Sequence, residues 1–439
     1  MSDVPKNWAS ASIAELTSKV GSGATPLGGE AAYKPSGIPL IRSMNVVFFG
    51  FKRDGLAYLD GAQAAALDGA TVEANDVLLN ITGASIGRVT VAPADLHGAR
   101  VNQHVCIIRP KSDVDYRYLN AYLSSPNVQG MIWADNTGTT RQALTKQQIL
   151  GFEVPLAPKA EQKRIADKLD TVLTRVDAVN TRLARVAPLL KRFRQSVLAA
   201  ATSGRLTEDW RGANGLSRPW PLVLLGEVAR DFSYGSAAKS SPAGHVPVLR
   251  MGNIQDGALD WSDLVFTSDP AEIAKYRLQD GDVLFNRTNS PELVGKTAVF
   301  RGEREAIYAG YLIRVRCSSD LLPDYLNYCL GSPAGKHYCW QVKSDGVSQS
   351  NINAKKLAAF SFGLPSLDEQ TEIVRRVETL FAFADRLEAR LAQAQTAATR
   401  LTPALLAKAF RGELVPQDPN DEPAAELLRR LQAERASAP

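Results

Sequence analysis

The chain has few of the residues that build disulfide frameworks, metal sites or membrane anchors. Its 439 residues include only four cysteines and four histidines. Four scattered cysteines in a chain of this length do not make a disulfide framework, so we expect a reduced, cytoplasmic protein. Cys329, His337 and Cys339 lie near one another but lack the second ligand pair of a zinc site. No apolar run approaches the roughly 20 residues of a membrane span, and the first residues carry no signal-peptide pattern.

Catalytic motifs are also missing from the sequence. Gly295-Lys296-Thr297 ends like a phosphate-binding loop, but Ser290 stands where that loop needs its first glycine. The following Ala298-Val299-Phe300 reads as a strand, whereas a phosphate loop feeds the N-terminus of a helix. The chain also lacks the Asn-Pro-Pro-aromatic segment that amino-methyltransferases use around a flipped base. We therefore expect a non-catalytic protein that binds no metal and no cofactor.

What the chain does contain is an internal repeat, clearest in two long apolar series with 4-3 spacing. Each member of the second series follows its partner by 208 positions. A 4-3 apolar spacing is the seam of a coiled coil, so the two series can pair with each other. The first series is Ile165, Leu169, Val172, Val176, Val179, Leu183, Val186, Leu190 and Phe193, and the second is Ile373, Val377, Leu380, Ala384, Leu387, Leu391, Ala394, Ala398 and Leu401.

The repeat extends beyond the helices into the segments that precede them. Trp8 and Trp220 open the two halves, Pro39–Val46 matches Pro247–Ile254, and Asp76–Asn80 matches Asp282–Asn286. Tyr118-Leu119-Asn120 with Ser125-Pro126 likewise matches Tyr325-Leu326-Asn327 with Ser332-Pro333. Between these matches the halves differ almost everywhere. The sequence therefore predicts a duplicated domain-plus-helix unit with divergent loops.

The boundaries of this unit follow from composition and from breaks in the helical pattern. We expect an α/β domain at 1–157, a helical region at 158–204, a linker at 205–219, a second α/β domain at 220–366, a second helical region at 367–414 and a tail at 415–439 that ends in a short helix. β-branched runs predict strands at 77–81 and 101–108, and a helix is expected at 116–123. Pro188 should kink the first long helix or start a new segment, and Thr402-Pro403 should break the second.

The charge and the divergent loops suit an anionic partner. The net charge is +5, and the first long helix is rich in basic residues. These are Lys159, Lys163, Arg164, Lys168, Arg175, Arg182, Arg185, Lys191, Arg192 and Arg194, for which an ordinary solvated helix face is the alternative interpretation.

Several loop residues have side chains suited to base edges and phosphates. Arg or Lys can pair with guanine, Asn or Gln with adenine, and Ser or Thr with phosphate oxygens. Gln142 and Gln349 are the strongest candidates, because each lies in a Thr/Ser-rich loop at the same place in its repeat. The full set is Thr25, Arg42, Asn45, Thr139, Thr140, Arg141, Gln142 and Lys146 in the first half, and Lys239, Arg250, Asn253, Arg287, Ser348, Gln349 and Asn351 in the second.

Nearly the whole chain resembles the specificity subunit of type I restriction-modification systems. The resemblance rests on the two tryptophan openings, on Gly23-Ala24-Thr25-Pro26, on the helix entries Pro155–Gln162 and Leu364–Gln370, and on the ending Ala409–Pro423. The second half departs from it at Gly235-Ser236-Ala237-Ala238, which lacks the Thr-Pro pair.

The resemblance implies an α+β protein: two α/β target-recognition domains separated by two long helices, which form an antiparallel coiled coil with a pseudo-twofold internal repeat. Each domain would read one half of a split, asymmetric site in double-stranded DNA. The helical region would recruit two methyltransferase subunits that use S-adenosylmethionine, and restriction subunits that use ATP and Mg²⁺ would join them. The alternatives are a protein–protein adaptor scaffold and an enzyme whose site escapes sequence inspection.

Overall fold

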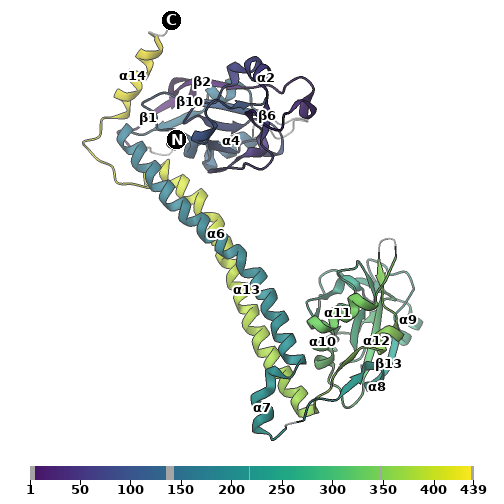
Figure 1. The fold of residues 1–439 in the computed structure, drawn as a ribbon. Helices are drawn as coiled ribbons and strands as arrows, with labels where there is room; N and C mark the ends of the chain where they lie inside the picture. Colours follow the sequence, from purple (N-terminus) through teal and green to yellow (C-terminus); the bar gives the residue numbers. More distant parts are fainter. Residues whose placement is uncertain (1–4, 135–142, 217, 347–348, 437–439) are drawn as a thin grey trace. The chain divides into compact units, whose positions relative to one another are not determined.

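The computed structural model describes residues 5–134, 143–216, 218–346 and 349–436. It divides into unit 1, residues 1–183 with 393–439, and unit 2, residues 184–392. Figure 1 traces the chain through both. Among the described residues, no helix has both the length and the apolar character that a membrane crossing needs.

A four-stranded antiparallel sheet lies at the centre of the α/β domain of unit 1. Its strand order is β2 (Thr17–Ser22), β10 (Val105–Pro110), β7 (Val77–Asn80) and β8 (Val89–Val91). Successive side chains of a strand point to opposite faces. Val77 and Leu79 accordingly enter one hydrophobic core and Leu78 enters another, so the sheet is covered on both sides.

Smaller sheets and short helices surround this sheet. The strands β6 (Ala57–Leu59), β3 (Ile38–Ile41) and β9 (Arg100–Val101) form one sheet, β1 (Ala9–Ser12) pairs with β11 (Glu153–Leu156), and β4 (Val46–Val47) pairs with β5 (Gly50–Phe51). The helices are α1 (Ile13–Leu16), α2 (Gly61–Ala66), α3 (Tyr116–Leu123), α4 (Pro126–Ala134) and α5 (Lys146–Leu150). The predicted helix at 116–123 is confirmed, and β7 confirms the predicted strand at 77–81 except for its last residue. The single strand predicted at 101–108 is wrong in its first half, because a turn at 102–104 separates β9 from β10.

Unit 2 repeats this design strand for strand. Its central sheet is β13 (Ala229–Tyr234), β22 (Leu312–Cys317), β18 (Val283–Asn286) and β20 (Thr297–Val299); its second sheet is β17 (Val265–Thr267), β14 (Val246–Leu249) and β21 (Ile307–Tyr308). The pairs β12 (Leu222–Leu224) with β25 (Ser361–Gly363) and β15 (Ile254–Gln255) with β16 (Ala258–Leu259) complete the match. Unit 2 also has a sheet of β19 (Thr288–Asn289), β24 (Ser350–Asn351) and β23 (Ser344–Asp345). Its short helices are α7 (Glu208–Ala213), α8 (Leu225–Val228), α9 (Pro270–Tyr276), α10 (Pro323–Gly331), α11 (Pro333–Val342) and α12 (Ala354–Ala358).

Two long helices, α6 (Lys159–Thr202) and α13 (Leu367–Ala409), pack together, and each contains a proline. The new segment predicted at Pro188 and the break predicted at Thr402-Pro403 are wrong, because both helices continue through these positions. Both prolines are exposed. Water can therefore reach the carbonyl oxygen four residues earlier, which a proline leaves without its helical donor.

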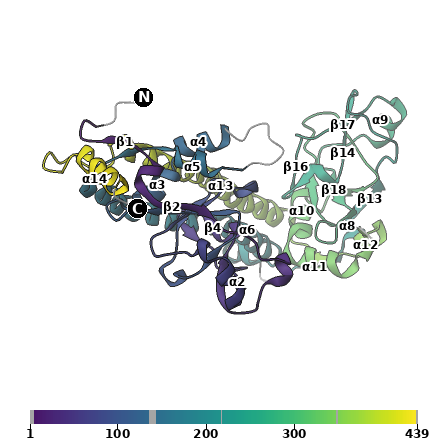
Figure 2. The same ribbon diagram turned by 90° about the horizontal axis from the view of Figure 1, so that it is seen from above.

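The segments after the two long helices also fold. The predicted linker contains α7, and Thr207 just before it is fully buried. The predicted final helix is α14 (Ala424–Ala436), which lies beside β1 in unit 1 (Figure 2). Its Ala424, Leu427 and Leu431 are buried in the main core of that unit. Each domain is thus completed by a segment that follows a long helix.

Candidate nucleic-acid interface

Several of the predicted seam residues in unit 1 are buried, where α6 packs against α13 and the α/β domain. Ile165 and Leu169 share a core with Leu406 of α13 and with Phe410, which directly follows that helix, and Val176 is buried as well. Val172 and Leu183 are half-buried. The 4-3 series does not hold along its whole length, however, because Val179 and Leu401 are exposed. A straight helix drifts by about 20° per heptad from a 3.5-residue repeat, which turns such positions outward.

In unit 2 the two helix segments run antiparallel. Arg194 of α6 contacts Asp385 at 2.5 Å and Glu388 at 3.1 Å, whereas Leu206, further along, accepts a hydrogen bond from Arg376, earlier in α13. The seam residues Leu190, Ile373, Val377 and Leu391 are buried here, and Leu380 and Leu387 are half-buried.

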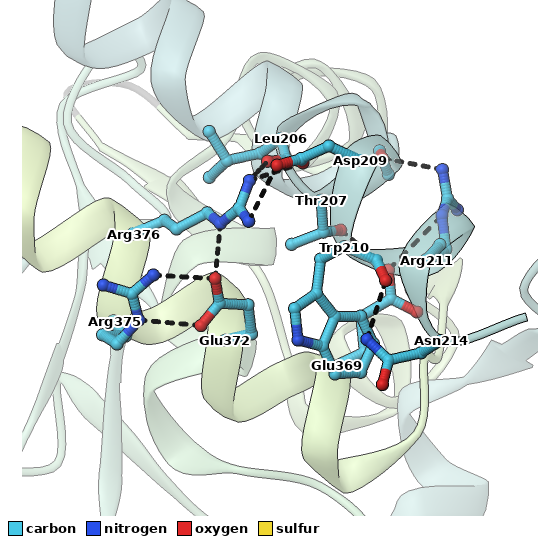
Figure 3. Close-up of polar contacts among 11 residues, drawn as sticks. Leu206, Thr207, Asp209, Trp210, Arg211, Asn214, Glu369, Glu372, Arg375 and Arg376 are labelled. Atoms are coloured by element: carbon cyan, nitrogen blue, oxygen red, sulfur yellow. Dashed lines mark hydrogen bonds and ion pairs between the residues drawn. The ribbon is translucent and has the colours of Figure 1, made fainter. Parts of the chain in front are cut away.

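A buried glutamate at the start of each long helix joins the helix to its domain. Glu369 accepts hydrogen bonds from Trp220 Nε1 at 2.9 Å and from Thr207 Oγ1 at 2.7 Å. Arg211 Nε lies 3.6 Å from the Glu369 carboxylate (Figure 3). Glu161 accepts one from Trp8 Nε1 at 3.0 Å and one from Gln417 Nε2 at 2.5 Å. Burial raises the pKa of Glu161. The two tryptophans recur in the sequence, as do the Glu161-Gln162 and Glu369-Gln370 pairs at the helix starts. Each Trp–Glu contact is therefore a structural anchor.

Asn45 and Asn253, two of the predicted base-reading residues, are buried in matching turns. They are 0% and 2% exposed. In each turn the asparagine Oδ1 accepts from the backbone N–H of Arg42 or Arg250, and its Nδ2 donates to two backbone carbonyls. All the hydrogen-bonding groups of these amides are used inside their own domain. We therefore assign both asparagines a structural role and leave them out of the interface proposed below.

Arg42 and Arg250 are held by neighbouring acidic residues. Arg42 pairs with Glu30 at 2.9 Å and donates to the Gly55 carbonyl, and its guanidinium lies over Tyr33. Arg250 pairs with Asp263 at 3.0 Å. A phosphate or a base would have to compete with these partners.

Arg287 stands in a cationic and aromatic cluster of unit 2. Its guanidinium lies 4.6 Å from the centre of the Tyr234 ring and donates to Asn351 Oδ1 at 3.3 Å. Asn351 in turn donates to Thr288 Oγ1 at 2.7 Å. The cluster joins β19 and β24 to the edge of the central sheet, so two predicted site residues, Arg287 and Asn351, do meet. The exposed Gln349 lies in the adjoining turn, where its carbonyl accepts from the Gly346 N–H at 2.8 Å.

The other predicted contacts that the structure describes are Thr25, Lys146 and Lys239. Lys146 at the start of α5 and Lys239 are exposed, and the hydroxyl of the half-buried Thr25 bonds to Gln103. Thr139, Thr140, Arg141, Gln142 and Ser348 lie outside the described residues.

Part of the basic character of α6 is neutralised within the chain. Lys159 pairs with Asp113 at 2.6 Å, and Arg164 pairs with Asp421 at 2.5 Å. Together with Arg194, these residues fix helix ends and helix pairs. The interpretation of the α6 basic residues as a surface for an anionic partner is weakened to that extent.

Sequence inspection missed two exposed tryptophans, Trp133 and Trp340. They are 49% and 57% exposed and end matching helices, α4 and α11. Their spacing could have revealed them, since each follows its Ser-Pro helix start by the same number of residues.

The fold thus defines a class of protein with two similar α/β domains, each joined to a stretch of two packed long helices. The family model of the type I restriction modification DNA specificity domain matches residues 5–187 and again residues 220–395. The chain belongs to this family, and it is a specificity subunit of a type I restriction-modification system. The family and the fold class predicted from the sequence are confirmed.

Relatives and solved structures agree with this assignment. The chain is 30% identical to the type I restriction enzyme EcoKI specificity subunit of Escherichia coli strain K12, over 99% of this chain and 97% of that protein. It is 34% identical to the StySPI specificity subunit of Salmonella potsdam, over 75% and 74%.

Two solved structures share the fold. A chain from a study of complex assembly and conformational transition of the type I R-M system has a TM-score of 0.74 at 22% identity and covers 94% of this chain and 100% of its own length. The HsdS subunit from Thermoanaerobacter tengcongensis has a TM-score of 0.59 at 21% identity, with coverage of 94% and 98%.

Proposed function

We propose that this chain reads a bipartite, asymmetric site in double-stranded DNA, one half with each α/β domain, and that it catalyses no reaction itself. The observation that carries the proposal is a shared framework with different surfaces. Asn80 and Asn286 end the matching strands β7 and β18. The next residue is the buried Ile81 in unit 1 but the cationic Arg287 in unit 2.

The neighbouring strand differs in the same way. Tyr234, which lies under Arg287, ends β13, whereas the matching strand β2 ends in Ser22. Arginine and aromatic side chains recognise different base features from small polar or apolar ones. Two domains that differ in this way are expected to prefer two different half-sites.

The paired helices supply the second part of the proposal, a fixed interval between the two half-sites. Along one helix, Ile165 to Phe193 corresponds to a rise of about 42 Å at 1.5 Å per residue. That length is comparable to about 12 base pairs of B-DNA, taking about 34 Å for each 10 base pairs. An interrupted target with an unread spacer of this order is the expected result.

The third part is the recruitment of two methyltransferase subunits, for which a groove in unit 1 is a suitable docking place. The groove has a volume of about 1070 Å³ and lies among the β4–β5 hairpin, α3, α6 and α13. It follows α6 from Ala166 to Asn180, about 21 Å at 1.5 Å per residue, which is enough for a helix of the partner.

The walls of this groove carry exposed apolar side chains and one buried polar atom that has no hydrogen-bond partner among the described residues. Phe48 and Phe49 at the hairpin tip are exposed. Asn120 is 6% exposed, and its Oδ1 accepts no hydrogen bond from the described residues. In unit 2 the matching Asn327 is satisfied, because it accepts from Thr297 Oγ1 and donates to the Gly257 carbonyl. An apolar partner segment with a donor would satisfy the groove of unit 1.

In the assembled complex, restriction subunits would join the methyltransferase subunits. S-adenosylmethionine would be bound by the methyltransferase subunits, and ATP with Mg²⁺ by the restriction subunits. This chain would hold neither, and its part would be to choose the DNA sequence and to position the partners.

Selection from a random duplex library tests the proposal. The full chain, alone and with its methyltransferase subunit, should enrich two short motifs separated by a constant unread interval. Arg287→Ala should relax the preference in one motif and leave the other unchanged. A single continuous motif, or no enrichment in either arrangement, would refute DNA reading by two domains and favour the protein–protein adaptor. Methyl transfer by the chain without its partner would contradict the non-catalytic role.

A further inference from the structure

Trp133 and Trp340 occupy the same position in the two repeats, and the predicted DNA-reading residues do not explain this match. Between α4 and α11, aligned at their first proline, nine positions can be compared: Pro126–Ala134 against Pro333–Gln341. Only the proline and the tryptophan are the same. The proline has a local reason, since it suits the first turn of a helix.

The core does not explain the tryptophan. The buried positions of these helices are Val128 and Ile132 in α4 and the matching Gly335 and Cys339 in α11. The indoles lie one position beyond them, about half exposed. A single exposed aromatic side chain is ordinary on a protein surface. An exposed tryptophan at the same position in two helices that otherwise differ in sequence points to a shared surface function.

The charge around Trp340 favours an anionic partner. Neither α4 nor α11 contains an Asp or Glu. Lys336 and His337 are exposed on α11, one turn before Trp340. The Lys343 ammonium lies 4.3 Å from the centre of the indole ring and also pairs with Asp345 at 2.6 Å, so the indole is held in place by a cation that is already neutralised.

The position of α11 in the domain also favours contact with an anionic partner. Its end leads directly into β23, which pairs with β24, and β24 carries Asn351 of the Arg287 cluster. The exposed Gln349 lies in the turn between the two strands. Trp340 therefore borders the surface for which a DNA-reading role is proposed, and Trp133 holds the same position in the other repeat.

We propose that Trp133 and Trp340 are a repeated pair of DNA contacts, in which each indole packs against the bases of one half-site beside the residues that read it. The inference rests on the proposed function and deepens it. An indole can stack on any base or press between two base pairs, so it adds affinity and fixes position without selecting a sequence. This would explain why the tryptophan is the same in two domains whose reading residues differ.

The test compares Trp340→Ala and Trp133→Ala with the wild-type full chain on the duplex selected above. Each substitution should weaken binding about 5- to 100-fold, the range of a lost base–aromatic contact. The slope of log affinity against log salt should not change, because an indole neutralises no phosphate. Trp340→Phe should keep most of the affinity, since the aromatic face is retained.

Phe383→Ala is the matched control, because Phe383 is an exposed aromatic residue on α13 with 48% exposure. It should leave the DNA affinity within about twofold of wild type. Unchanged thermal unfolding of all variants would show that they fold.

The proposal is overturned if both alanine variants bind the duplex as tightly as wild type. If these variants also lose the methyltransferase subunit, the indoles contact protein instead of DNA. A wild-type chain that binds no DNA at all would contradict the proposed function itself, which is a separate result.

Discussion

Removing the buried carboxylate of Glu369 should destabilise unit 2 much more than removing the half-buried carboxylate of Glu372 on the same helix. Glu369 is 2% exposed and accepts from Trp220 Nε1 and Thr207 Oγ1 at 2.9 and 2.7 Å. Glu369→Ala leaves both donors buried or half-buried without an acceptor. Hydrogen bonds to a charged group are worth about 1.5–3 kcal/mol each, so the expected loss in free energy of unfolding is about 3–5 kcal/mol.

Glu372, one turn further along α13, supplies the matched control (Figure 3). It binds Arg375 and Arg376 at 2.6 to 2.8 Å, and the Arg375 side chain is 64% exposed to water. Ion pairs that water can screen contribute little, so Glu372→Ala should cost about 1 kcal/mol or less.

Urea unfolding of the full chain measures the difference. With a slope of about 2.5 kcal/mol per molar urea, Glu369→Ala should lower the midpoint of the unit 2 transition by about 1 to 2 M. Tryptic cleavage within residues 205–220 should increase in parallel, because Thr207 and Trp220 lose their anchor. A midpoint shift no larger than that of Glu372→Ala would refute the reasoning that this carboxylate joins helix and domain.

Three further predictions follow from the same contacts and surfaces. Hydrogen bonds from Arg375 and Arg376 lower the pKa of Glu372 to about 2, so its stabilising contribution is complete above about pH 4.5 and is lost as the pH falls toward 2. Glu372→Gln should flatten that part of the acid unfolding curve, and an unchanged curve would contradict the assignment. Replacing Leu183 and Leu391 together by Asp should abolish spacing-dependent target binding, because unpaired carboxylates are disfavoured in an apolar seam; survival of the spacing preference would show that the helix pair does not set the interval. Gln142→Ala should relax base preference in one half-site and Gln349→Ala in the other, as read by duplex selection, and a change in the same half-site for both would count against one reader per domain.

Much of the fold could be predicted from local pattern. β-branched runs predicted β7 and part of β10. The 4-3 apolar series located both long helices, because burial of one helix face imposes a period that is visible in the residues. The prolines at 188 and 403 misled the prediction. Their effect depends on whether water can reach the freed carbonyl, which is a property of the folded surface and not of the residue type.

The candidate site was predictable only in part. Arg287 and Asn351 were identified as separate polar loop residues, and the structure joins them by a direct hydrogen bond. Tyr234 packs against Arg287, and Thr288 accepts a hydrogen bond from Asn351. Asn45 and Asn253 have the same chemistry in the sequence but are buried. The difference between a base reader and a turn former lies in exposure, which residue type alone does not give.

The sequence by itself determined that this protein is a duplication: two helical seams, two tryptophan openings and two Glu-Gln helix starts at a near-constant offset. Tertiary structure alone decided what completes each copy. Glu161 takes its second donor from Gln417, 256 residues away, and Glu369 takes its own from Thr207, 162 residues earlier. Such partners are chosen by the packing of distant segments around a buried charge that must be satisfied, and no local period in the chain records that choice.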